Sequence, residues 1–424
     1  MDRPSVSALA DIAEKEPQNL QNYVDQIVHL QFLCDDAIYH KIFERLRFPD
    51  LEVLSLDAND LNNDKSLESY LQPKLKRFRF YGGPISDAFL EKLQNSCPHL
   101  EELLIDNPRD LISPEGLLRF LEGAKALKHV MVVYGMDKVI TDSVFTTLAT
   151  KPDLETLELQ KTITTGLVSK ALGQHTPSGA KGRLFPRLSK LACVAQSDGF
   201  TALLPHLSQL DSLDVRIEPG GDSSNVSYLL LDVSMYCPNL RVTSLENLDP
   251  EGVHISPQSL VRLAERLNQL EKLCISNEKS KVEEFDVSHF ASMVKALPRL
   301  RTLRLLFKCR LTEAALVEAA NSCETLTELE IWGSYDLQNL AETEASFPKL
   351  KALELGYLVP PSVLTEVATE AAKTAQFLKR IAPGLEEFSV VSPNPFGQMV
   401  SREVDGIYRS KSSDEGDLST QSDC

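Results

Sequence analysis

A unit of about two dozen residues recurs along this chain and constrains its fold more than any other feature. The clearest copy is residues 311–334, LTEAALVEAANSCETLTELEIWGS. Apolar residues fall at i, i+3, i+4 and i+7 from Leu316, which predicts a helix with one buried face. Thr312 precedes this helix, where its hydroxyl can accept a bond from a free amide. At 328–331 glutamate alternates with apolar residues, which predicts a short strand with one buried face.

Thirteen strong copies of the strand half can be aligned on their first leucine, and a weaker copy precedes them at Ile27. Stacked copies of such a unit bury the hydrophobic faces of their neighbours in one continuous core. We therefore predict a single α/β solenoid with one parallel sheet of 13 or 14 short strands. The strong copies are FPDLEVLSL (48–56), QPKLKRFRF (72–80), CPHLEELLI (97–105), AKALKHVMV (124–132), KPDLETLEL (151–159), FPRLSKLAC (185–193), LSQLDSLDV (207–215), CPNLRVTSL (237–245), LNQLEKLCI (267–275), LPRLRTLRL (297–305), CETLTELEI (323–331), FPKLKALEL (347–355) and APGLEEFSV (382–390).

The charge and hydropathy of the chain exclude two classes of partner. The formal net charge of −17 repels phosphate backbones, so we expect no nucleic-acid binding. No apolar run reaches the length of about 18 residues that a membrane-spanning helix needs. The N-terminus also has no signal-peptide run. We therefore expect no membrane association, and we expect a monomer.

The residue types that carry catalysis or metal binding show no recognisable spacing. The eight cysteines form no CxxC pair and no histidine pair has metal-ligand spacing, so we predict no metal site and no cofactor. Several cysteines occupy repeat positions and are predicted to be buried, reduced thiols, which favours the cytoplasm and/or nucleus. The motifs of nucleotide binding, zinc proteolysis and serine hydrolysis do not occur, so we predict that the chain is not an enzyme.

The pattern divides the chain into three parts. Residues 1–23 are predicted to form an N-terminal capping helix that begins within the first seven residues and ends at Pro17. Residues 24–392 form the solenoid of about 13–14 repeats. Residues 393–424 lose the pattern and become rich in Ser, Asp and Glu, so we expect a disordered acidic tail that is dispensable for folding. Three hydroxyl side chains are candidate helix N-caps within the solenoid: Ser86, Ser113 and Thr141.

The solenoid is predicted to be less regular in its middle and near its end. Residues 175–183, 218–225 and 277–286 read as loops, because Pro, Gly or charged residues interrupt the repeat there. Thr243 replaces an inward apolar residue, which predicts weaker strand pairing at that repeat. An unusually long helix is expected after Pro361.

The repeats resemble the cysteine-containing leucine-rich repeats of F-box proteins, which are of the ribonuclease-inhibitor type. The helix starts at 85–87 (Ile-Ser-Asp) and 140–142 (Ile-Thr-Asp) match one element of that family. Cys97-Pro98 and Cys237-Pro238 match another. The resemblance covers residues 24–391 and implies a horseshoe with the parallel sheet on its concave face and the helices on its convex face. Residues 9–32 are also similar to the passage that links an F-box to its repeats in fungal proteins.

An F-box is a helical module that docks on the Skp-type adaptor of a ubiquitin ligase. Residues 1–22 lack the Leu-Pro…Ile-Leu pattern of that module. We therefore expect that this chain alone does not bind the Skp-type adaptor.

Three functions remain open from the sequence. The leading prediction is a non-catalytic solenoid that recognises a protein partner on its concave face. One alternative is the substrate-recognition subunit of an SCF-type ubiquitin ligase, with ligase components as partners, whose F-box is degenerate or missing from this sequence. The other alternative is a small-ligand sensor with a pocket in the concave face.

The period of a strand identifies which side chains leave the core. Residues at even positions after each anchor leucine point to the sheet face, and exposed apolar, Arg and Trp side chains there are typical of binding sites. Met131 and Val133 could instead be covered by a neighbouring loop, and Trp332 could instead pack on Tyr335 or the adjacent strand. The predicted partner-binding residues are Arg77, Arg79, Tyr81, Leu104, Met131, Val133, Arg304, Glu328, Glu330 and Trp332.

Overall fold

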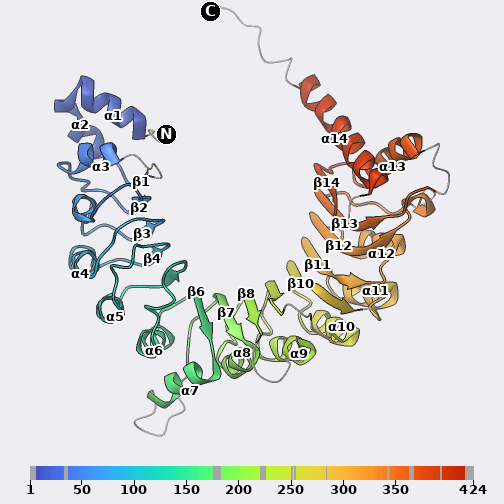
Figure 1. Cartoon of the computed structure of the whole chain (residues 1–424), viewed down its shortest axis with the longest axis horizontal. Helices are drawn as coiled ribbons and strands as arrows, with labels where there is room; N and C mark the ends of the chain where they lie inside the picture. Colours follow the sequence, from blue (N-terminus) through green and yellow to red (C-terminus); the bar gives the residue numbers. More distant parts are fainter. Residues whose placement is uncertain are drawn as a thin grey trace, which may run out of the picture. The chain divides into compact units, whose positions relative to one another are not determined.

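The computed structural model describes residues 6–32, 37–174, 183–219, 226–249, 252, 255–282, 284–340, 344–361, 367–391 and 394–415. These residues belong to two compact units, unit 1 (residues 1–209) and unit 2 (residues 210–424). Each unit alternates helices and strands along the chain, as Figure 1 shows.

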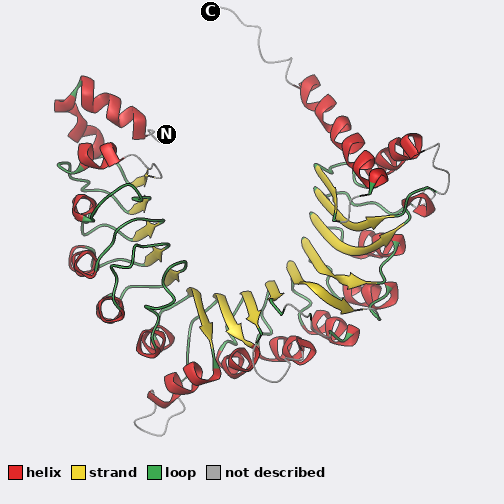
Figure 2. Ribbon diagram, in the orientation of Figure 1, coloured by secondary structure: helices red, strands yellow, loops and turns green. Residues whose placement is uncertain are grey.

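Unit 1 contains a parallel sheet of seven described strands whose order follows the chain. In this unit the helices from α4 onward lie along one side of the sheet, and none of them crosses the other side (Figure 2). The strands are β1 (His29–Phe32), β2 (Val53–Leu56), β3 (Arg77–Phe80), β4 (Glu102–Ile105), β5 (His129–Val132), β6 (Thr156–Ile163) and β7 (Lys190–Gln196). The helices are α1 (Val6–Lys15), α2 (Pro17–Val24), α3 (Ala37–Phe43), η1 (Lys65–Tyr70), α4 (Asp87–Ser96), α5 (Pro114–Gly123), α6 (Asp142–Thr150), α7 (Thr165–Gln174), α8 (Ser197–Leu203) and η2 (Leu204–His206).

Unit 2 also contains seven described strands, all parallel to their neighbours and in chain order. The strands are β8 (Ser212–Glu218), β9 (Val242–Asn247), β10 (Lys272–Val282), β11 (Thr302–Cys309), β12 (Glu328–Tyr335), β13 (Ala352–Leu358) and β14 (Glu387–Val390). The helices are α9 (Val226–Tyr236), α10 (Pro257–Arg266), α11 (Val287–Lys295), α12 (Glu313–Ser322), η3 (Leu337–Leu340), α13 (Val367–Ile381) and α14 (Pro395–Glu415). The predicted α/β fold with 13 or 14 parallel strands is thus confirmed.

The repeated leucines form the core of each unit. In the β4 repeat Leu100, Leu103 and Ile105 are at most 2% exposed, and the same positions are buried in the other strong repeats, except that Val390 of the last repeat is half-buried. Burying one such side chain contributes roughly 1.5–3 kcal/mol to the free energy of folding. The cost of truncating it depends on how well the neighbouring side chains can fill the cavity that is left. The core therefore rests on the positions that define the repeat.

Helix caps mark the start of several repeats. The hydroxyls of Ser86, Ser113 and Thr141 accept bonds from backbone amides three residues on, so these predicted N-caps are confirmed. Thr312 stands at the N-cap position of α12, but its side chain makes no capping hydrogen bond. The predicted role of its hydroxyl is therefore wrong, although the helix does begin at the next residue, Glu313.

The carboxylate beside a cap joins its helix to the next repeat. Asp87, the first residue of α4, accepts bonds from the amide (2.8 Å) and hydroxyl (2.6 Å) of Ser113 at the start of α5. Asp64 does the same for Ser86 at the start of α4. A side chain on Gly116 would place its Cβ 2.0 Å from the Asp87 carboxylate, so glycine is needed for this approach. Ser86 thus caps α4, and Asp87 beside it aligns the start of α5.

Two expected irregularities in unit 2 are absent from its described strands. Thr243 is 1% exposed and pairs in register with Leu213 and Leu273, so the expected weakening of strand pairing does not appear. Residues 277–286 were expected to form a loop, yet β10 continues to Val282 and pairs again with β11 after a register shift. Asn277, Ser280 and Val282 are buried between the charged residues of this stretch, which a count of charges does not show.

Both ends of the chain carry helices. Pro17 separates α1 from α2 and occupies the first turn of α2, where its missing N–H costs nothing. At the other end α14 contacts α13 and β14, and it buries Phe396, Val400 and Val404. Residues 395–404 of the expected disordered tail (393–424) thus lie in a helix that packs on the unit, because apolar residues at i, i+4 and i+8 give it one buried face, whereas residues 416–424 lie outside the described residues.

Candidate protein-binding face

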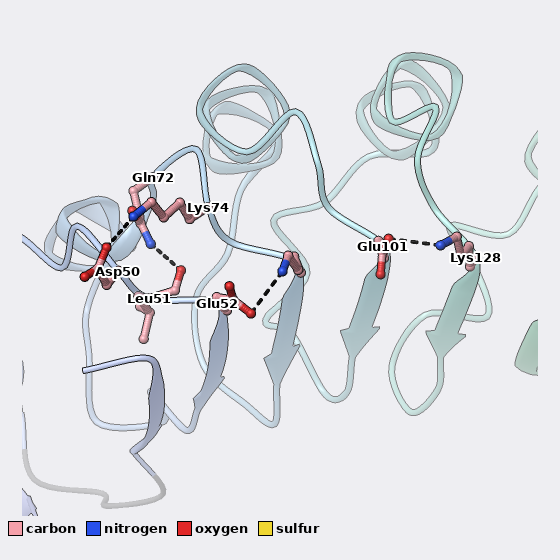
Figure 3. A network of polar contacts seen from close by, with 8 residues as sticks. Asp50, Leu51, Glu52, Gln72, Lys74, Glu101 and Lys128 are labelled. Atoms are coloured by element: carbon pink, nitrogen blue, oxygen red, sulfur yellow. Dashed lines mark hydrogen bonds and ion pairs between the residues drawn. The ribbon is translucent and has the colours of Figure 1, made fainter. Parts of the chain in front are cut away.

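A ladder of alternating charge runs along the starts of the strands in unit 1. The residues directly after the first anchor leucines alternate in charge, and two ion pairs join neighbours one repeat apart, Glu52–Lys76 (3.0 Å) and Glu101–Lys128 (2.9 Å). The hydrogen bond from Lys128 lowers the pKa of Glu101. Figure 3 shows Glu101 bonded to Lys128, and beside this ladder Asp50 bonded to Lys74. Exposed ion pairs of this kind stabilise a fold by about 0–1 kcal/mol each. We therefore interpret these pairs as contacts that help to keep neighbouring strands in register.

The unit 1 face is the outer side of β3–β5. Arg79, Leu104 and Met131 stand opposite one another on these strands and are half-buried, as is Tyr81 just past β3. Arg77 is exposed, and no ion pair holds it among the described residues. The predicted outward direction of these side chains agrees with their exposure. A cation, an aromatic ring and apolar groups therefore share one surface.

Arg79 has a second role that the sequence did not indicate. Its Nε lies 2.5 Å from the Glu102 carboxylate, which is 6% exposed. This hydrogen bond is the main cause of the raised pKa of the Arg79 guanidinium. Arg79 compensates a buried charge, so only part of its guanidinium is free to contact a partner.

Val133 and Val194 do not belong to the exposed surface. Each is 7% exposed, although both lie six residues after an anchor leucine, at a position where the period of two predicts a side chain on the sheet face. Val133 lies past the end of β5 in a turn closed by the bond from the Met136 amide, where alternation no longer holds. Val194 lies opposite Thr162, where the pairing of β6 and β7 shifts register. The alternative that Val133 is covered is therefore correct. The apolar part of the unit 1 face is limited to Leu104 and Met131.

The unit 2 face is the outer side of β11–β14. Four polar side chains form one row across it, because Arg304, Glu330, Glu354 and Ser389 are successive register partners. Arg304 lies 3.3 Å from Glu328 and 3.5 Å from Glu330. At the far end of the row the Ser389 hydroxyl donates to Glu354 at 2.7 Å.

The two glutamates of this row are register partners on neighbouring strands. Burial, the negative charge of Glu354 and a hydrogen bond to it raise the pKa of Glu330 to about 7, and Arg304 opposes them only in part. Glu354 and Ser389 were absent from the predicted site. Both occupy the same position in their repeats as Glu330, so tabulating that position over every repeat would have found them.

Trp332 is half-buried at the end of the unit 2 face. Its indole Nε1 is hidden from water and has no hydrogen-bond partner among the described residues. The Tyr335 hydroxyl approaches the Trp332 carbonyl at 3.5 Å, and the Cys309 thiol donates to the same carbonyl at 2.8 Å. These two contacts involve the Trp332 backbone, and the residue as a whole remains partly exposed.

Other kinds of site find little support in the described residues. A polar cavity of about 240 Å³ lies between α4 and α5, on the helix side of unit 1. In the described part of the chain, no group of three or more His, Cys, Asp or Glu side chains could hold a metal ion. None of the described helices is both long and apolar enough to cross a membrane. The described cysteines include Cys97, Cys237 and Cys323, which are free and buried as predicted.

Comparisons with known proteins find a match only among solved structures. No model of a protein family matches the chain, and no curated protein matches it. A chain of the crystal structure of the Rad7 and Elc1 complex in yeast matches with a TM-score of 0.54 and 16% identity, covering 95% of this chain and 92% of that one. The fold is that of a leucine-rich-repeat protein.

Two more distant matches are also leucine-rich-repeat structures. The ectodomain of the Arabidopsis thaliana receptor kinase GASSHO1/SCHENGEN3, in complex with CASPARIAN STRIP INTEGRITY FACTOR 2, has a TM-score of 0.37 and 15% identity over 82% of this chain and 46% of that one. LegL7 from Legionella pneumophila has a TM-score of 0.32 and 11% identity over 89% of this chain and 98% of that one.

Proposed function

We propose that this chain is a non-catalytic leucine-rich-repeat protein that binds a protein partner on the sheet faces of its units. The observation that carries the proposal is a helix-free sheet face in unit 1 that presents Arg77, Tyr81, Leu104 and Met131 together (Figure 2). Neighbouring strands fix these side chains in place, so binding requires less ordering than on a loop. Cationic, aromatic and apolar groups side by side are the composition of protein interfaces.

The finer proposal is a substrate-recognition subunit of a ubiquitin ligase of the SCF type, acting in the cytoplasm and/or nucleus. The repeat elements that resemble those of F-box proteins support it. The similarity to a chain from the Rad7 and Elc1 complex supports assembly with a second protein. The free cysteines are compatible with a reducing compartment.

Capture of partners from an extract of the source organism, followed by mass spectrometry, would test the general proposal. Arg77→Ala should weaken retention of a specific partner, because it removes the unpaired cation of the unit 1 face. Arg119→Ala is the matched control, since Arg119 is an exposed arginine on α5, on the helix side of the same unit. Equal retention by both variants would contradict binding on the unit 1 face.

Purification with a Skp-type adaptor tests the finer proposal separately. The finer proposal requires a stoichiometric complex of this chain with the adaptor, whereas residues 1–22, which lack the pattern of an F-box, predict that the adaptor does not remain bound to this chain alone. A stoichiometric complex of the two purified proteins would show that expectation to be wrong, and would place the chain directly in such a ligase.

A further inference from the structure

Helix α9 of unit 2 carries apolar side chains on its outer face. Tyr228 is 67% exposed, Met235 is 52% exposed, and Leu231 between them is half-buried. These residues fall at i, i+3 and i+7, so they form one stripe along the helix, which we call the α9 stripe. Leu230 and Val233, on the other side of the helix, are at most 1% exposed and belong to the core. The stripe therefore points away from the core.

The polar residues of α9 are placed the opposite way. Three of the eleven residues of this fully described helix are Ser or Asp, and the rest are apolar or aromatic. Ser227 and Ser234 are at most 7% exposed. Ser227 accepts a bond from the Ser256 amide at the start of α10, and Ser234 lies 3.5 Å from the Arg266 guanidinium of α10. Asp232 is thus the one polar side chain of α9 that is not buried.

The neighbouring helices show that packing of the solenoid does not require this stripe. Counted back from the anchor leucine, its two exposed positions are occupied by Gln258 and Glu265 in α10 and by Ser288 and Lys295 in α11. All four of these side chains are exposed. A helix that is apolar on every side is normally buried, and an exposed apolar patch is typical of an interaction site. The α9 stripe is therefore a surface that a second molecule covers.

We propose that the α9 stripe docks an amphipathic helix of a partner protein, with apolar residues three and four apart and a Lys or Arg beside them. Side chains at i, i+3 and i+7 are the spacing that a facing helix complements, with the two axes about 8–10 Å apart. The stripe lies on the helix side of unit 2 (Figure 1). This contact therefore goes beyond recognition on the sheet faces and does not depend on it.

Asp232 sets the charge of the partner. It follows Leu231 directly and lies one turn from both Tyr228 and Met235, so a helix on the stripe removes water from its carboxylate. Asp232 makes no ion pair within the described part of the chain, and the Arg266 guanidinium lies against Ser234 instead. A carboxylate that loses water needs a compensating charge. The partner helix must therefore bring a cation to this position.

Two other occupants fit the surface less well. A second copy of the chain would need about 20 residues a side for a stable contact, whereas the stripe with Asp232 supplies four. Helices that lie on a membrane surface carry Lys and Arg, which bind anionic lipids. Helix α9 has neither residue, and Asp232 is repelled by such lipids. A single basic amphipathic helix matches both the size and the charge of the surface.

A labelled synthetic peptide tests the proposal on the full chain by fluorescence anisotropy. The probe is a helical peptide of about three heptads with Leu at a and d and Lys at e and g. One control peptide has Ser at a and d and the same charge, and a second keeps Leu but has Glu at e and g. We expect the Leu–Lys peptide to bind about tenfold more tightly than either control.

Matched variants locate the binding site. Met235→Gln should weaken binding of the Leu–Lys peptide about tenfold, whereas Met399→Gln, at an exposed methionine of α14, should not change it. Asp232→Asn should remove the preference for the Lys peptide over the Glu peptide. Glu324→Gln changes the net charge equally at an exposed residue outside α9 and should retain that preference. Circular dichroism would check that each variant folds.

Equal binding by Met235→Gln and Met399→Gln, or equal affinity for the Leu and Ser peptides, would overturn the proposal. Light scattering and sedimentation with phosphatidylserine vesicles identify the other occupants. A dimer of the natural chain that Met235→Gln dissociates would assign the stripe to a second copy. Vesicle binding that Met235→Gln abolishes would assign it to a membrane, and either result would overturn docking of a partner helix. Failure of the Arg77→Ala capture experiment would bear on the sheet face of unit 1 alone.

Discussion

At the scale of single residues, a buried histidine links the stability of unit 1 to pH. His40 is 1% exposed, its ring contacts Phe32, and its Nε2 lies 3.3 Å from the Asp57 carbonyl. Burial lowers its pKa to about 4, against about 6.5 in an unfolded chain. Because the unfolded chain binds a proton that the folded chain excludes, stability should fall as the pH drops from about 6.5 to about 4.

We predict that this loss is on the order of 1–3 kcal/mol and that His40→Gln removes most of it. Urea unfolding at pH 4.5 and 7.5 would measure it. His99→Gln, which changes an exposed histidine of the same unit, should retain the pH dependence of the natural chain. If His40→Gln and His99→Gln respond alike to pH, the histidine is not the cause.

The sequence predicted the outward direction of side chains where the strands are regular. The period of two places Arg77, Leu104 and Glu330 outside the core, because each lies inside a strand with unbroken pairing. It fails for Val133 because the strand has already ended there. The pairing of Glu330 with Glu354 depends on register between repeats, which no single strand reveals.

At the scale of elements, the helix starts hold neighbouring repeats together. Asp87→Ala removes the acceptor for both the amide and the hydroxyl of Ser113, at the start of the next helix. We expect a loss of about 1–2 kcal/mol in the free energy of unfolding, the usual cost of a lost cap. Glu91→Ala, on an exposed position of the same helix, should cost less than about 0.5 kcal/mol in the same urea titration.

The last helix shows why composition misleads at the scale of an element. The many Ser, Asp and Glu residues after 393 favour disorder, yet Val400 is fully buried and Met399 beside it is 39% exposed. Val400→Ala should therefore lower the unfolding free energy by about 1–3 kcal/mol, whereas Met399→Ala should have little effect. Similar melting temperatures for the two variants would mean that α14 does not stabilise unit 2.

At the scale of the whole molecule, the repeat decides the fold and says little about the partner. Thirteen aligned copies predict parallel strands in chain order because each leucine position has one role in the core. The side chains that leave the core, such as Arg77 and Glu354, are unconstrained by that role and differ from repeat to repeat. Their chemistry is therefore specific to this chain, and its partner cannot be derived from the repeat.

The unit 2 face gives the sharpest test of partner binding by the full chain. Trp332 is half-buried and its indole Nε1 has no hydrogen-bond partner among the described residues. The free energy of folding therefore already includes the penalty for burying an unpaired donor. Trp332→Phe removes that donor and keeps most of the ring, so it should leave the melting temperature unchanged or raise it slightly. Trp332→Ala should lower affinity for a captured partner by about 1–3 kcal/mol if the indole is a hot spot, and Trp332→Phe by less. Calorimetric titration beside a circular dichroism melt would separate the two effects. Equal affinity of the natural chain and Trp332→Ala would move the binding site away from this tryptophan, and loss of folding in Trp332→Phe would mean that the indole fills the core.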